Sequence, residues 1–136
     1  MAIGQVDKAI KRSRQAQKHD PVDLIISTLL GMAYYFSRKF NEAIAEGEKT
    51  LTMAPDYVPA YLWLGMAYEQ TNKYTDAVAI LMKGKTKTSG KNAKLNALLA
   101  HAQAKSGNIS AASSELDELS IRAKRGYISQ YNFARI

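Results

Sequence analysis

The sequence has no cysteine, and it has only two histidines, His19 and His101. The absence of cysteine excludes a disulfide framework and thiolate chemistry. It also fits a reducing compartment, so we expect a cytoplasmic protein. Neither histidine has a cysteine or a second histidine at metal-ligand spacing, so we expect no metal site.

A long apolar run is also missing. The longest mostly apolar stretch, residues 24–36, is shorter than the roughly 20 residues that a membrane-spanning helix needs. Stretches of that length are usually buried core helices. Near the N-terminus, Asp7 and Lys8 stand where a signal peptide would need a continuous apolar segment. We therefore expect no membrane association.

Acidic residues are absent between Asp76 and Glu115, within a sequence whose formal net charge is +7. The charged side chains in this gap are all lysines, at Lys83, Lys85, Lys87, Lys91, Lys94 and Lys105. The simpler interpretation is a solvated lysine face that prevents self-association. The other is a basic patch that attracts an acidic partner or nucleic acid.

The sequence does contain a repeat of 34 residues. Residues 30–34 and 64–68 are both Leu-Gly-Met-Ala-Tyr, and Ala77 follows Ala43 at the same period. Such recurrence indicates one small unit, stacked, because a single unit cannot bury its apolar face alone. Within each unit, apolar residues recur at helical spacing on both sides of a three-residue break. Each unit is therefore predicted to be a helix, a turn and a second helix.

The pattern predicts these elements in detail. We expect helices at residues 5–18, 23–36, 40–53, 58–70, 74–86, 92–105 and 109–123, with a further helix starting near Ser129, and no strand. Small residues such as Ala43 and Ala77 should lie where helices cross, because only small side chains allow backbones to approach closely. Gly47 lies inside a predicted helix, where it should leave a hole or allow a close approach, and we expect Trp63 of the following helix to fill that space.

These residues resemble the tetratricopeptide repeat, a family of 34-residue helix–turn–helix units. The matches are Leu30, Leu64 and Leu99, each followed by a small residue; Tyr34 and Tyr68, with Gln103 in the third unit; and Ala9, Ala43, Ala77 and Ala112. The resemblance implies an all-α, right-handed α-solenoid forming a single domain over residues 1–136. The implied units are a partial repeat at 1–23, full repeats at 24–57, 58–92 and 93–126, and the start of another at 127–136. We accordingly expect the chain to be a piece of a longer protein.

The resemblance also implies where a partner binds, since the first helix of each unit lines a concave groove in this family. The corresponding groove residues are Ile25, Thr28, Met32, Tyr35, Phe36, Leu62, Met66, Glu69, Gln70, Lys94, His101 and Lys105. Of these, Met32, Tyr35, Leu62 and Met66 should form one apolar strip, covered by a peptide, a segment of the parent chain or a second copy of the chain. Apolar and methionine side chains suit an amphipathic helix or an extended apolar segment. Thr28 and Met32 replace the lysine and asparagine clamp of chaperone-tail receptors, which argues against that class.

We therefore expect a scaffold for protein–protein interaction, and neither an enzyme nor a cofactor-binding protein. Residues 79–86 nearly spell a phosphate-binding loop, but they lie in a predicted helix with no strand before it. The acidic cluster of Glu115, Asp117 and Glu118 lies in no recognisable pocket that would make it an acid/base pair.

Residues 124–134 resemble a segment common in bacterial tetratricopeptide modules that follow a winged-helix DNA-binding domain, a nucleotide cyclase or a protein kinase. That likeness implies the sensing or assembly module of a larger bacterial regulatory protein, such as a transcriptional regulator. The alternative is a nucleic-acid-binding helical repeat that uses the lysine-rich residues 83–105. It would need base-reading side chains at equal positions of every unit, and Ile25, Pro59 and Lys94 do not supply them.

Overall fold

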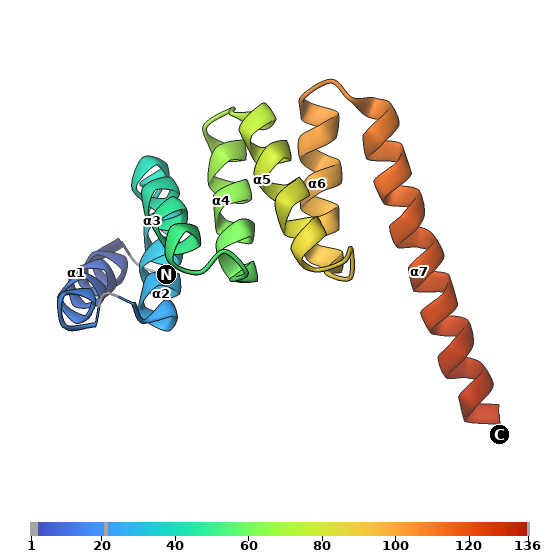
Figure 1. Cartoon of the computed structure of the whole chain (residues 1–136), viewed down its shortest axis with the longest axis horizontal. Coiled ribbons are helices and arrows are strands. Elements are labelled where there is room, and N and C mark those ends of the chain that lie inside the picture. Colours follow the sequence, from blue (N-terminus) through green and yellow to red (C-terminus); the bar gives the residue numbers. More distant parts are fainter. Residues whose placement is uncertain (1–2, 21, 136) are drawn as a thin grey trace.

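A computed structural model describes residues 3–20 and 22–135, with side chains described from residue 4 to residue 124. In this part of the chain, seven α-helices follow one another and no strand occurs (Figure 1). They are α1 (Ile3–His19), α2 (Leu24–Phe36), α3 (Phe40–Met53), α4 (Val58–Gln70), α5 (Tyr74–Lys87), α6 (Ala93–Lys105) and α7 (Ile109–Arg135). The protein is an all-α solenoid of helix pairs, as the repeat predicts, and most helix ends lie within two residues of their predicted positions.

The helices form two layers. In the inner layer, α2 packs against α4 and α4 packs against α6. In the outer layer, formed by α1, α3, α5 and α7, no Cα atoms of different helices come within 8 Å in the described part of the chain. The stack is therefore tighter along its inner side, and the exposed side of α2, α4 and α6 is the concave one.

Each turn within a helix pair uses a residue with positive φ. These residues are Arg38 (φ 64°), Asn72 (φ 60°) and Gly107 (φ 95°). After α2, the Arg38 N–H donates to the Tyr35 carbonyl at 3.0 Å, and the Lys39 N–H donates to the Tyr34 carbonyl at 2.8 Å. This pair of bonds closes the helix end with one left-handed residue, a position that glycine occupies most easily.

Replacing Arg38 with glycine is therefore expected to raise the free energy of unfolding by about 1 kcal/mol, because a left-handed conformation is costly for a residue with a Cβ. The matched change is Gly107→Ala, which should lower it by about 1 kcal/mol. No neighbouring atom lies within 4 Å of the Cβ that this alanine would add, so only the backbone conformation changes in energy. Urea unfolding followed by circular dichroism measures both. An Arg38→Gly variant no more stable than the parent would contradict this account of the turn.

Buried apolar side chains form two clusters along the stack, and Trp63 is the largest of the fully buried side chains. The Trp63 side chain is 1% exposed, and its Nε1–H donates to the Ala43 carbonyl at 3.1 Å. A Cβ built on Gly31 would lie 2.7 Å from Trp63 Cε2, and one built on Gly47 would lie 2.7 Å from Trp63 Nε1. The prediction that Trp63 occupies the space beside Gly47 is confirmed. Ala43 and Ala77 are both fully buried.

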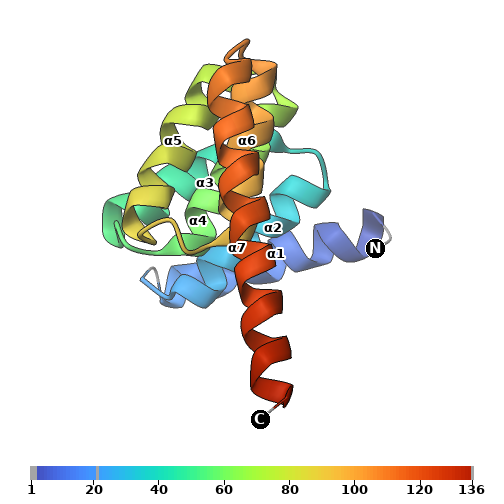
Figure 2. The ribbon, with the colours of Figure 1, turned by 90° about the vertical axis from the view of Figure 1, so that its right-hand side faces the viewer.

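One predicted boundary is wrong. The sequence predicts that a helix ends at residue 123 and that another begins near Ser129, whereas α7 is a single helix from Ile109 to Arg135 that extends past the other helices (Figure 2). Residues 120–129 contain no proline, and Gly126 is their only glycine. One glycine costs about 1 kcal/mol inside a helix, which does not stop a helix by itself.

Candidate functional site

The predicted groove residues all lie on the three inner helices. We call the exposed side of α2, α4 and α6 the inner surface. Its exposed members are Ile25, Phe36, Gln70, Lys94, His101 and Lys105, and its half-buried members are Thr28, Met32, Tyr35, Leu62, Met66 and Glu69. None of them is buried, so all are open to a partner to some degree. Their role in binding stays a prediction.

The most apolar part of the inner surface is a stripe on α2, formed by Ile25, Leu29, Met32 and Phe36 and called here the α2 stripe. Its members recur every three or four residues and so share one helix face. Ile25 is 72% exposed, Leu29 59% and Phe36 62%. The strip predicted from sequence, which continues onto Leu62 and Met66 of α4, is more covered than this one, since those two residues are half-buried.

Leu29 belongs to the α2 stripe although the sequence analysis did not select it. Its equivalent in the next unit is Trp63, which packs against Gly31 of the preceding inner helix. No inner helix precedes α2 in the described part of the chain, so Leu29 has no such neighbour. The sequence repeat could have predicted that Leu29 is exposed, because an apolar residue at that position of a unit is covered only by the inner helix of the preceding unit.

An aromatic hollow lies at the C-terminal end of the α2 stripe. Tyr35 packs edge-on against Phe36 and Phe40, with ring centroids 5.6 Å apart in both pairs. These rings, with Arg38 and Gln70, line a hollow of about 400 Å³. The hollow joins α2 to the C-terminal end of α4, so an apolar group bound on the α2 stripe could continue onto the neighbouring helix.

The inner surface becomes polar and charged toward α6. His101 Nδ1 lies 2.8 Å from Glu69 Oε1, which links α6 to α4. The Glu69 side chain is 11% exposed and that of His101 is 59% exposed, so the carboxylate is covered while the imidazole faces solvent. Lys94 and Lys105, both exposed, lie at opposite ends of α6. A partner would therefore meet apolar side chains on α2 and cations on α6.

The lysines of the acid-free segment do not form one patch. Lys83, Lys85 and Lys87 lie on the outer helix α5, whereas Lys94 and Lys105 lie on the inner helix α6. Two of the outer lysines are paired with carboxylates from elsewhere in the chain. Splitting between two layers and pairing with carboxylates favour the simpler interpretation of this segment.

The first of these pairs joins α5 to α7. Lys85 Nζ lies 2.7 Å from Glu115 Oε1 and 3.5 Å from Glu118 Oε2, and the hydrogen bond to Glu115 raises the pKa of Lys85. The second pair places Lys87 Nζ 3.0 Å from Asp56 Oδ1. Glu115 and Glu118, selected in the sequence as an acidic cluster, are thus partners of a lysine.

Among the described residues, no group of three histidine or carboxylate side chains could coordinate a metal. Residues 79–86, whose sequence approaches a phosphate-binding loop, lie within α5. In the same part of the chain, each helix is too short or too polar to cross a bilayer.

Comparison with known proteins finds a family match over part of the chain and similar folds among solved structures. Residues 37–88, from the turn after α2 to the end of α5, match the tetratricopeptide repeat family. Among solved structures, the chain is similar to MamA residues 41 to the end from Desulfovibrio magneticus RS-1, with a TM-score of 0.80, 17% identity, and coverage of 90% of this chain and 68% of the other. A further structure of MamA has a TM-score of 0.80 at 24% identity, with coverage of 94% and 74%. The TPR2B domain of yeast Sti1, solved as a complex with pHsp70, has a TM-score of 0.70 at 24% identity, with coverage of 75% and 86%. At these identities the likeness establishes the fold.

Proposed function

We propose that the protein is a scaffold whose inner surface binds a segment of another protein. The observation that carries the proposal is the α2 stripe, because three large apolar side chains on one helix face are each more than half exposed. Contiguous apolar surface of this kind marks interaction sites on soluble proteins. The structural likeness to a Sti1 domain that was solved with pHsp70 supports the same kind of use.

The chemistry of the inner surface suggests what the bound segment resembles. Inner helices in contact lie about 8 to 10 Å apart, so α2 and α6 are separated by about 20 Å. An extended segment covers that distance with about six residues at 3.3 Å each. The segment would place apolar side chains on the α2 stripe and carboxylates near Lys94 or Lys105. An amphipathic helix crossing the same three helices would meet the same gradient.

The proposal extends to the protein's place in a larger assembly. The resemblance of residues 124–134 to a segment of bacterial regulators supports a sensing or assembly module of a cytoplasmic regulatory protein. In that role the chain contributes recognition, and any catalysis or DNA binding belongs to other parts of the assembly.

The test uses two substitutions at exposed positions, Ile25→Glu and Phe36→Glu, combined in one variant. Peptides selected from a random 12-residue library on the wild-type protein serve as probes, and fluorescence anisotropy measures their affinity. We expect the variant to bind at least about tenfold more weakly, since a charge at the centre of an apolar contact costs more than 1 kcal/mol. Both positions are exposed, so the variant should fold.

Leu116→Glu is the matched control, because Leu116 is an apolar residue of α7 that is 55% exposed and lies outside the inner surface. It should leave affinity unchanged. Equal affinity of the double variant and the wild-type protein, with both folded by circular dichroism, would remove the inner surface as the binding site. Sedimentation of the same proteins tests whether the occupant is a second copy of this chain.

A further inference from the structure

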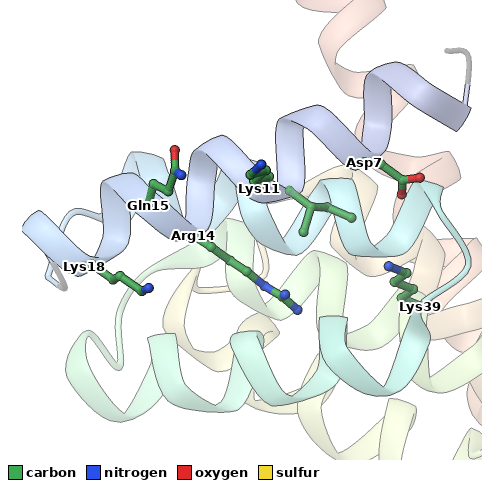
Figure 3. A pocket seen from close by; sticks show the side chains of 7 residues that line it. Asp7, Lys11, Arg14, Gln15, Lys18 and Lys39 are labelled. Atoms are coloured by element: carbon green, nitrogen blue, oxygen red, sulfur yellow. The ribbon is translucent and has the colours of Figure 1, made fainter.

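A second candidate site lies on the opposite, outer side of the molecule. A hollow of about 460 Å³ is lined by Asp7, Ile10, Lys11, Arg14, Gln15 and Lys18 of α1 and by Lys39, which directly precedes α3. Figure 3 shows Arg14 pointing from α1 toward α3, with Lys39 at the N-terminal end of α3. Helices α1 and α3 both pack on α2, and no Cα atoms of the two described helices come within 8 Å of each other, although Gln17 Nε2 of α1 donates to Glu46 Oε1 of α3 at 2.6 Å. This spacing leaves room for the hollow between them. We call it the outer hollow.

The outer hollow concentrates positive charge that the described part of the chain does not neutralise. Four of its lining residues are basic and one is acidic. No carboxylate in that part of the chain lies within ion-pair distance of Lys11, Arg14, Lys18 or Lys39, whereas the outer lysines Lys85 and Lys87 are both paired. Cations held close together without partners repel one another, so an anion bound among them would be favoured.

The repeat provides an internal comparison, since positions 34 residues apart are equivalent. Lys11, Arg14 and Lys18 correspond to Ala45, Glu48 and Thr52 of α3. In α5 the equivalent residues are Ala79, Met82 and Thr86. The fold of the unit therefore does not require basic side chains at these positions, and they are specific to the first outer helix.

Arg14 is held in place by a tyrosine of the inner layer. Its Nε–H donates to Tyr34 Oη at 2.6 Å, and its guanidinium carbon lies 5.3 Å from the centre of the Tyr34 ring. The equivalent pair in the next unit is Tyr68 and Glu48, in which Tyr68 Oη donates to Glu48 Oε1 at 2.8 Å. Each tyrosine thus anchors the facing residue of the preceding outer helix, but only Arg14 directs a cation into a hollow. The remaining guanidinium N–H groups suit a carboxylate, which pairs well with a planar donor set.

We propose that the outer hollow binds an acidic segment of a protein, with several carboxylates in a row. Lys11, Arg14 and Lys18 follow one face of α1 over seven residues, which at 1.5 Å per residue is about 10 Å. Three residues of an extended peptide span the same distance, so one small anion would engage only part of the row. The lining contains no aromatic side chain on which a base could stack, and single-stranded nucleic acid depends on such stacking. The proposal is independent of the inner surface.

The experiment measures binding of a fluorescein-labelled hexaglutamate peptide by anisotropy at low ionic strength. The test variant is Lys11→Gln with Lys18→Gln. Its matched control is Lys49→Gln with Lys83→Gln, which removes the same charge from exposed positions of α3 and α5 outside the hollow. We expect the test variant to weaken binding at least about tenfold, because both lysines lie within contact distance of one segment in the hollow, whereas charges farther than a Debye length from the ligand are largely screened. The control should change affinity less than about twofold.

Two further probes separate the ligand classes, a single-stranded DNA hexamer and inorganic phosphate. Hexaglutamate binding that depends on Lys11 and Lys18 and exceeds binding of both probes supports the proposal. Equal weakening by the two lysine pairs would mean general charge attraction and would overturn it. So would tighter binding of the DNA or of phosphate, or no binding of hexaglutamate at all. The Ile25→Glu, Phe36→Glu variant should retain hexaglutamate binding, which distinguishes this site from the inner surface.

Discussion

Replacing Trp63 with alanine is expected to lower the free energy of unfolding by about 3 to 5 kcal/mol, the range seen for large buried aromatic residues. The indole is 1% exposed, and two of its neighbours are Gly31 and Gly47. Glycines have no side chain that could move into the vacated space, so the cavity would persist. The change also leaves the Ala43 carbonyl without its side-chain donor. A domain of this size is stable by only about 5 to 15 kcal/mol, so the loss is a large fraction of the total.

Circular dichroism in urea should measure this effect, because Trp63 is the only tryptophan in the sequence and its replacement removes tryptophan fluorescence. Trp63→Phe is the graded control. It retains much of the ring packing and loses the indole donor, so its loss should be smaller, about 1 to 2 kcal/mol. A Trp63→Ala variant less than about 1 kcal/mol below the parent would mean that the ring is not confined between the first two helix pairs.

Replacing Gly47 with alanine is expected to destabilise the protein by about 1 to 3 kcal/mol, although alanine is favoured over glycine inside a helix by about 1 kcal/mol. The added Cβ would lie 2.5 Å from Leu64 Cγ and 2.7 Å from Trp63 Nε1, which is shorter than any relaxed contact. Helices α3 and α4 would have to separate, and the hydrogen bond from Trp63 to Ala43 would lengthen.

Gly4→Ala provides the comparison, since Gly4 lies in α1 with no neighbouring atom within 4 Å of an added Cβ. It should leave stability unchanged or raise it by up to about 1 kcal/mol. Opposite signs for the two substitutions, measured in the same urea series, would show that packing determines the outcome at Gly47. A stabilised Gly47→Ala variant would instead mean that α3 and α4 are farther apart than described.

The parts of the fold that the sequence predicted are those determined by one unit and its register. The bounds of α3 and α4 agree residue for residue with the predicted helices 40–53 and 58–70, because the apolar period, the turns around Arg38 and Asn72 and the proline at Pro55 determine them locally. The contact of Trp63 with Gly47 was also predictable, since a missing side chain on one helix and a large one on the next must coincide when the units stack.

The parts that were missed depend on what surrounds a unit. Leu29 has the same place in its unit as Trp63, yet Leu29 is exposed and Trp63 is buried, because in the described part of the chain an inner helix precedes that of Trp63 but not that of Leu29. The outer hollow joins Lys11 to Lys39 across two helices, and no local pattern indicates that meeting. The predicted end of α7 was wrong because the turns of this repeat have weak sequence signals. The sequence near residue 126 therefore does not show whether a turn is present there.

The arrangement of helix contacts gives the stack an unequal resistance to opening. Helix α4 packs against α2, α3, α5 and α6. In the described part of the chain, α1 has Cα atoms within 8 Å of α2 alone and α7 of α6 alone, and long side chains add the pairs Gln17–Glu46 between α1 and α3 and Lys85–Glu115 between α5 and α7. In a chain of units joined through nearest neighbours, the ends separate at the lowest free-energy cost and the middle opens last. Helix α4 therefore contributes more helix–helix contacts than either end helix and should open last. Its Trp63 and Leu64 connect the first two helix pairs, so fraying from either end can proceed far before the centre loses its order.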